Sequence, residues 1–181
     1  MPANSIAVQA MTAANGRLPS DAAGASSTAE FLFAKSSSRY ILYAPGSNKL
    51  LNRPFRVHLW GRATGGTTTN LTIKLYSGIS ATIGSNTNIA TSGAIAVNSV
   101  SGNFRLVSDM VWDATSDKYQ GVFYGHINGT AVSDTINASV IVPASDPSVA
   151  EGTNGFTATG QFSASNANSL AILDGFELEV L

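Results

Sequence analysis

Residues 54–62 read PFRVHLWGR, and apolar and polar side chains alternate along this stretch. Successive side chains of a β-strand point to opposite faces, so one set is expected to face a core: Phe55, Val57 and Leu59. The other set is Arg56, His58 and Trp60. This period of two is typical of an antiparallel strand with one buried face.

The same alternation recurs along the chain after residue 30, and clusters of Gly, Asn, Ser and Pro separate the stretches. No convincing amphipathic helix interrupts them. The expected strands span residues 31–34, 39–44, 54–62, 70–78, 103–113, 118–129, 136–142, 156–164 and 174–181. This pattern predicts an all-β fold, an antiparallel β-sandwich that is jelly-roll-like, with about eight core strands.

Residues 1–30 are rich in Ala, Ser, Asn and Gly and show no strand alternation. We expect an extended, flexible N-terminal arm over 1–30 and a β-sandwich domain over 31–181. Ile6, Val8 and Met11 are apolar residues within the arm, and we expect them to dock on this subunit or on a neighbouring one.

Charged residues make up only 12% of the chain and are unevenly distributed. Residues 31–108 contain eight basic residues and no acid, whereas residues 109–181 contain nine acids and one Lys. The two parts therefore carry about +8 and −8. Such a split predicts charge pairing, either within one subunit or between neighbouring subunits.

The sequence offers no credible catalytic or metal-binding set, and we expect neither an enzyme nor a cofactor. There is no cysteine, which excludes disulfides and thiolate chemistry. The sequence contains no G-x-S-x-G motif, and neither of the two histidines belongs to an H-E-x-x-H motif. Glu177 and Glu179 would lie about 6.6–7 Å apart on one strand, a spacing that glycoside hydrolysis tolerates. Their terminal position, without surrounding aromatic residues, favours a solvated face instead.

Binding candidates gather on and just before the strand at 54–62, where cations accompany an aromatic ring: Arg53, Arg56, Trp60 and Arg62. Nucleic acid is not favoured as a partner, because the acidic part of the chain offsets the basic part. No stretch is long and apolar enough to span a membrane. An alternative is a carbohydrate-binding domain, in which Trp60, Tyr76 and Tyr124 stack on sugar rings.

Three stretches within residues 50–130 carry a family resemblance: RPFRVHLWGRATGG (53–66), NLTIKLYSGISATIGSNTNIATSG (70–93) and SGNFRLVSDMVWDATSDKYQGVFYG (101–125). They resemble virion structural proteins of tailed bacteriophages, most of all the sandwich-type capsid decoration, or cement, proteins. The features that carry the resemblance are the strand ending in LYSG, the GSNT loop, and NFRLVSDMVWD followed by a turn and a glycine-containing strand.

The resemblance implies a protein that binds the outer surface of an assembled capsid and stabilises it. Its partners would be the major capsid protein and further copies of itself, with a homotrimer favoured, and its location would be the capsid exterior. No functional residue is carried over from the family. The carbohydrate-binding alternative corresponds to a tail-associated host-recognition domain.

Overall fold

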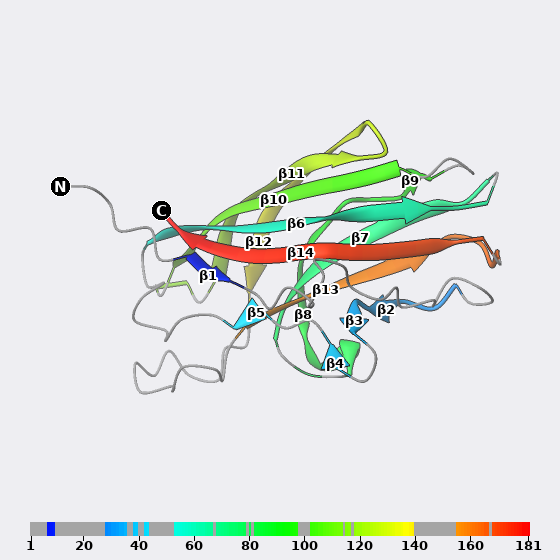
Figure 1. Ribbon diagram of the computed structural model, residues 1–181. Helices are drawn as coiled ribbons and strands as arrows, with labels where there is room; N and C mark the ends of the chain where they lie inside the picture. Colours follow the sequence, from blue (N-terminus) through cyan, green and yellow to red (C-terminus); the bar gives the residue numbers. More distant parts are fainter. Residues whose placement is uncertain are drawn as a thin grey trace.

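The computed structural model of the protein is built from β-strands (Figure 1). It describes residues 7–9, 28–35, 38–39, 42–43, 53–66, 68–78, 80, 82–97, 102–113, 115–116, 118–139, 155–166 and 168–181. Within these ranges the helical structure is one 3-10 turn, Ile83–Ser85, and no helix is long and apolar enough to cross a membrane. Every strand pairing in these ranges is antiparallel, so the prediction of an all-β antiparallel sandwich is confirmed.

The larger sheet has six strands in the order β1-β14-β6-β10-β11-β12. Their bounds are β1 Ala7–Gln9, β6 Pro54–Thr64, β10 Gly102–Asp113, β11 Lys118–Ile127, β12 Thr130–Ser139 and β14 Leu170–Val180. The strands β10, β11 and β12 follow one another directly as a meander. The other neighbours in this sheet are far apart in the sequence.

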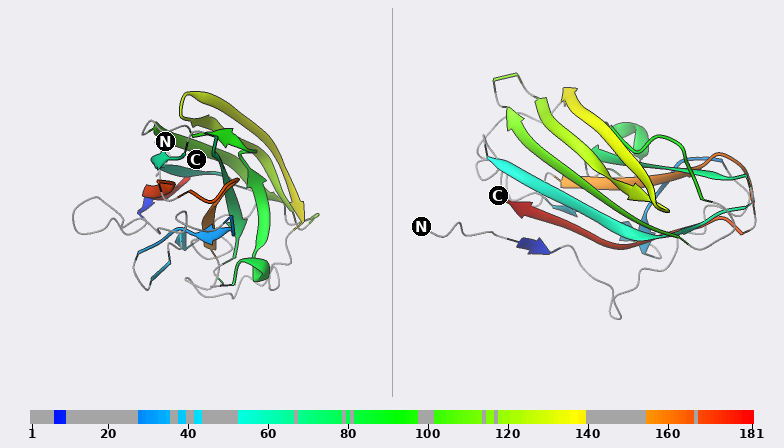
Figure 2. Two further views of the ribbon diagram at one scale, coloured as in Figure 1. Left: turned by 90° about the vertical axis from the view of Figure 1, so that its right-hand side faces the viewer. Right: turned by 90° about the horizontal axis from the view of Figure 1, so that it is seen from above.

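The smaller sheet has the order β2-β13-β7-β8, with β5 also pairing with β13 and β9 with β7. Its strands are β2 Phe31–Leu32, β5 Leu42–Tyr43, β7 Asn70–Ser77, β8 Thr87–Thr91, β9 Ile95–Ala96 and β13 Gly155–Phe162. The short strands β3, Ala34–Lys35, and β4, Ser38–Arg39, form a separate ribbon. The two main sheets face each other as layers (Figure 2).

The core lies between the two sheets, where the inward side chains of both are buried. The residues that the alternation assigns to the core in 54–62 and 70–78 are all fully buried: Phe55, Val57, Leu59, Leu71, Ile73 and Leu75. Aromatic rings join the layers, because the ring of Phe156 in β13 lies 5.9 Å from Phe55 and 5.6 Å from Tyr119 of the larger sheet, centroid to centroid. Burial raises the pKa of the Tyr119 phenol to about 12, so this ring stays neutral in the core.

A two-residue turn connects β11 to β12 and fixes their register. Asn128 and Gly129 have φ values of 50° and 77°, and Ile127 pairs with Thr130 across them. Two successive positive φ values are the geometry of a type I′ turn, for which Asn-Gly is the preferred sequence. The register then runs without a shift from this turn to Lys118 and Ser139.

The N-terminal part of the chain contacts both sheets. The strand β1 pairs with β14 at the edge of the larger sheet. On the smaller sheet, the Glu30 carboxylate accepts hydrogen bonds from Lys74 at 2.7 Å, from Tyr76 at 2.8 Å and from Thr159. The described part of residues 1–30 is therefore held by the sandwich, and the domain boundary at residue 30 stays a prediction.

Several strands differ from the sequence-based expectation, and two of them, β1 and β9, lie where no strand was expected. The strand β8 lies in a stretch expected to be a loop, and its consecutive buried residues Ile89 and Ala90, at a shift in register, break the alternation. The strand β12 begins at residue 130 rather than 136, and the inward-facing Asp134 interrupts its apolar face. The strand β14 begins at residue 170 rather than 174, and a bulge between Leu173 and Gly175 interrupts the alternation of its side chains.

Candidate functional site

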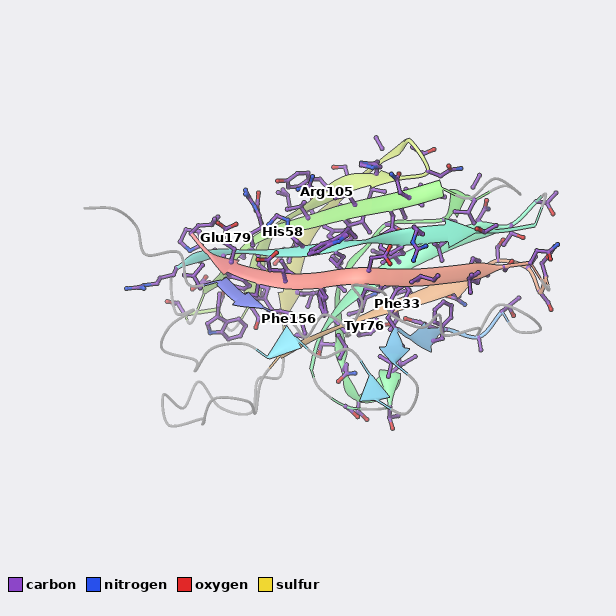
Figure 3. All side chains as sticks on the ribbon, viewed as in Figure 1. Phe33, His58, Tyr76, Arg105, Phe156 and Glu179 are labelled. Carbon is purple, nitrogen blue, oxygen red and sulfur yellow. The ribbon has the colours of Figure 1, made fainter. Side chains whose placement is uncertain are left out.

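The outer face of the larger sheet carries an open groove of about 730 Å³. Residues from four adjacent strands line it: His58, Trp60, Gly61, Arg62, Asn103, Phe104, Arg105, His126, Asp174 and Glu177. Figure 3 shows His58 and Arg105 on this sheet, apart from Phe33, Tyr76 and Phe156 in the lower part of the molecule. The groove thus lies on the side of the sheet that faces away from the core.

Strand register arranges the lining residues in rows across the sheet. Trp60 pairs with Gly175 on one side and with Arg105 on the other, and Arg105 pairs in turn with His126. Because neighbouring strands lie about 4.8 Å apart, the row from Gly175 to His126 spans roughly 14 Å. The adjoining row begins with Glu177, which pairs with His58.

A β-bulge in β14 shapes one wall of the groove. The register of β14 on β6 shifts between Leu173, which pairs with Gly61, and Gly175, which pairs with Trp60. Asp174 is the extra residue, so Asp174 and Gly175 both lie on the outer side between the buried Leu173 and Phe176. Bulges commonly redirect side chains in this way near functional sites.

The Trp60 indole packs over Gly175, because this residue has no side chain. A Cβ atom at residue 175 would be 2.0 Å from Cζ2, 2.2 Å from Cε2 and 2.5 Å from Cη2 of Trp60. The six-membered half of the ring therefore covers the Gly175 backbone, in space that any side chain would fill. Trp60 still keeps 37% of its surface exposed, so a rigidly placed aromatic ring faces solvent.

Asp174 holds the neighbouring cation in a fixed geometry. The Arg62 guanidinium donates from Nε and Nη2 to the two carboxylate oxygens of Asp174, each at 2.8 Å. Such bidentate pairs fix orientation as well as charge. The pair forms a rigid and electrically balanced part of the lining beside Trp60.

A second bidentate pair lies on the same face, outside the groove. Arg56 donates to Asp109 from Nε, and from Nη2 at 3.0 Å, while the Tyr124 hydroxyl donates to the same carboxylate at 2.9 Å. The Arg56 guanidinium holds the pKa of the Asp109 carboxyl below its ordinary value, although partial burial opposes this. Nearby, Nε2 of His58 lies 3.7 Å from the Glu179 carboxylate.

The two carboxylates considered for glycoside hydrolysis have different surroundings. Glu177 lines the groove, whereas Glu179 lies in the row of Arg56 and does not line it. Among the described residues, no three His, Asp or Glu side chains come close enough together to hold a metal ion. The groove brings an aromatic ring together with hydrogen-bond donors and acceptors.

The structure places the sequence-based binding candidates at several different locations. Trp60 and Arg62 line the groove, Arg56 lies on the same face outside it, and Arg53 is exposed just before β6. Val8 lies in β1, and Ile6 and Met11 are outside the described residues. Tyr76 was expected as a sugar-stacking residue, but it is only 7% exposed and donates to Glu30, so this expectation is wrong.

Several lining residues were not expected from the sequence: Asn103, Arg105, His126 and Asp174. The alternation in 103–113 does place Asn103 and Arg105 opposite the buried Phe104 and Leu106. Their proximity to Trp60 follows only from the pairing of β10 with β6, two strands about 50 residues apart, which the alternation does not encode.

Part of the charge split is balanced within the subunit. Basic residues of 31–108 form ion pairs with acids elsewhere in the same chain: Arg56 with Asp109, Arg62 with Asp174 and Lys74 with Glu30. Among the groove residues, Arg105 and Glu177 have no ion pair or side-chain hydrogen bond with any described residue.

No family model matches the chain, and no curated protein matches its sequence. Solved structures that resemble it include the Lotus tetragonolobus seed lectin (8% identity, TM-score 0.39, covering 100% of this chain and 94% of that chain). Another is the CBM2 module of Lactobacillus casei BL23 phage J-1 evolved Dit (12% identity, TM-score 0.40, 99% and 91% coverage). A third is peanut lectin with a 9mer peptide (8% identity, TM-score 0.37, 98% and 97% coverage). The second protein comes from a bacteriophage, and attachment to a capsid stays a prediction for this chain.

Proposed function

We propose that the protein is a non-catalytic carbohydrate-binding domain and that the groove on its larger sheet is the binding site. The observation that carries this proposal is the Trp60 indole, laid over Gly175 and exposed to solvent beside hydrogen-bonding side chains. A sugar ring offers an apolar face to an aromatic ring and hydroxyl groups around its rim. The groove provides for both, because polar groups that fix orientation surround its aromatic surface.

The polar groups suit hydroxyl recognition. The Arg62–Asp174 pair presents a fixed donor and acceptor next to the ring, and Glu177 adds an acceptor on the same wall. Asn103 carries an amide that both donates and accepts. Glycoside hydrolysis needs two carboxyl groups acting together. Of the two carboxylates that line the groove, Asp174 is engaged by Arg62, which leaves only Glu177 unpaired.

The test is a glycan-array screen followed by calorimetry on the best ligand. Trp60→Ala should weaken binding about thirtyfold or more, since loss of an aromatic anchor typically costs about 2 kcal/mol or more. The matched control is Val122→Ala, which truncates a 48%-exposed side chain on the same sheet face outside the groove. Unchanged affinity in Trp60→Ala, or no glycan binding by the wild-type protein, would contradict the proposal, and glycan turnover would contradict its non-catalytic part.

A second candidate is attachment to the outside of a phage capsid, and the edge of the larger sheet favours it. No described strand pairs with the outer edge of β12, whose ten residues contain no Lys or Pro and show no bulge. Natural proteins use those features to protect an edge strand from pairing with another chain. Of the protective features, this edge has the inward-facing Asp134, which accepts a hydrogen bond from the Thr91 backbone N–H. A ten-residue edge without the other features is suited to β-sheet addition by a shell subunit or a further copy.

Copy number in purified particles of the source phage tests this candidate. A number comparable to the major capsid protein supports decoration, and a handful of copies supports a tail location with host recognition. In the decoration case, Thr135→Lys should reduce attachment to shells, because it adds a charge to the exposed face of β12. Absence of the protein from particles would contradict both the capsid location and the tail location.

A further inference from the structure

The charged side chains of the groove are unequally engaged. Arg62 and Asp174 neutralise each other through two hydrogen bonds. Arg105 is an exposed cation that has no acceptor among the described residues, although it stands in the middle of the lining. A guanidinium has a planar set of donors that matches the two oxygens of a carboxylate or phosphate.

The position of Arg105 relative to Trp60 is set by the sheet. The two residues are direct partners on β6 and β10, so their Cα atoms lie about 5 Å apart across one strand spacing. His126 is the direct partner of Arg105 on the far side, on β11. A substituent on a sugar stacked over Trp60 therefore reaches Arg105 first and His126 next.

Glu177 lies on the opposite side of the ring. It is on β14, two strands from β10, in the row adjoining that of Trp60. The unpaired carboxylate of Glu177 and the unpaired guanidinium of Arg105 are thus separated by the aromatic residue. An anionic substituent is attracted on the Arg105 side, and hydroxyl donors are accommodated on the Glu177 side.

We infer that the glycan bound in this groove is acidic, and that its carboxylate or phosphate group binds Arg105 with His126 beside it while the sugar ring lies on Trp60. This inference rests on the proposed carbohydrate-binding function and names the ligand class of the same site. A neutral glycan would leave the exposed guanidinium without a charged partner. A cationic glycan would be repelled by the charge of Arg105.

The experiment compares three defined probes by calorimetry: neutral oligomers of N-acetylglucosamine, oligomers of galacturonic acid, and oligosaccharides of mannose that carry 6-phosphate groups. The variant is Arg105→Gln, and the matched control is Arg53→Gln, which removes an exposed cation before β6 and outside the groove. We expect at least one acidic probe to bind. Arg105→Gln should weaken that binding by about tenfold or more, and Arg53→Gln should leave it unchanged. Affinity should also fall as NaCl is raised, because salt screens exposed charges.

The two acidic probes separate the sources of the charge: binding of the uronic acid supports a carboxylate, and binding of the mannose 6-phosphate oligosaccharide supports a phosphate. If only the neutral probe bound, and Trp60→Ala abolished its binding while Arg105→Gln did not, the acidic-ligand inference would fall and the proposed function would stand. If an acidic probe bound equally well to Arg105→Gln, the inference would likewise be overturned. Failure of all three probes and of the glycan array would overturn both.

Discussion

Gly175 and Trp60 are cross-strand partners in which the glycine backbone is covered by the tryptophan ring, with only 2.0 Å between the ring and the place where a Cβ would be. The bulge at Asp174 brings this glycine to the outer face. One extra residue in β14 therefore determines both the orientation of the aromatic ring and the position of the acid that holds Arg62.

Gly175→Ala should disturb the groove without removing any of its functional groups. The new methyl group overlaps three atoms of the indole, so Trp60 must rotate away from its position. We expect weaker glycan binding, a shifted tryptophan fluorescence spectrum, and a loss of about 1–3 kcal/mol in the free energy of unfolding from overpacking.

The control for that change is Gly84→Ala, where a Cβ would meet nothing within 4 Å. It should alter neither fluorescence nor glycan affinity. If Gly175→Ala kept wild-type affinity and an unshifted spectrum, the ring would not depend on this glycine for its orientation.

Asp174→Asn tests whether the bidentate pair matters for binding rather than for folding. Both side chains are partly exposed, at 36% for Arg62 and 20% for Asp174, so the loss in unfolding free energy should stay within about 1 kcal/mol. Glycan affinity should fall, because Arg62 is no longer held beside Trp60. Asp109→Asn is the matched control, since it breaks a similar pair with Arg56 outside the groove. If both variants bound the glycan equally well, the Arg62–Asp174 pair would have no part in ligand recognition.

The alternation of side chains predicts the fold because burial enforces it residue by residue. Phe55, Val57 and Leu59 had to be inward, and they are. The site was less accessible to such reasoning. Trp60 and Arg62 follow from the pattern, but Arg105 and His126 join them only through strand register, and Asp174 only through a bulge.

The opposite faces of β11 can be compared at adjacent positions. Phe123 is fully buried and Val122 is 48% exposed. Phe123→Ala should cost about 3–5 kcal/mol of unfolding free energy, because it leaves a cavity between the sheets. Val122→Ala should stay within about 0.5 kcal/mol. Urea denaturation of the two variants measures both, and similar losses would contradict the assigned faces of the sheet.

The Glu30 carboxylate should make stability depend on acid pH. Burial by itself raises its pKa and is the largest single effect, but hydrogen bonds from Lys74, Thr159 and Tyr76 together outweigh it and lower the pKa below the ordinary 4.5. A carboxyl with a lowered pKa in the folded state stabilises the protein above its unfolded pKa. That contribution is lost as pH falls from 4.5 through the folded-state pKa.

Urea denaturation between pH 7 and pH 2 measures this effect as the difference between wild type and Glu30→Gln. The difference in unfolding free energy should be largest near neutral pH and shrink as the solution is acidified. Glu177→Gln serves as the control, because this carboxylate accepts no side-chain hydrogen bond from the described residues. A difference that did not change with pH would show that Glu30 is not bound as its ionised form.

Truncation of the N-terminus should distinguish residues 28–30 from those before them. Deleting 1–27 and deleting 1–30 both remove β1, so any effect of β1 is common to the two. The longer deletion also removes Glu30, which leaves Lys74, Tyr76 and Thr159 without their acceptor, and it removes the Thr28 carbonyl that accepts from Gln161 at 3.0 Å. Unsatisfied partly buried groups cost about 1–3 kcal/mol each, so deletion of 1–30 should unfold at a clearly lower urea concentration than deletion of 1–27.

Both truncated proteins should keep the β-sheet circular dichroism spectrum, since the core residues from Phe55 onward are intact. Coincident urea midpoints would mean that the sandwich does not depend on Glu30, and the boundary at residue 30 would then be supported as a division between arm and domain.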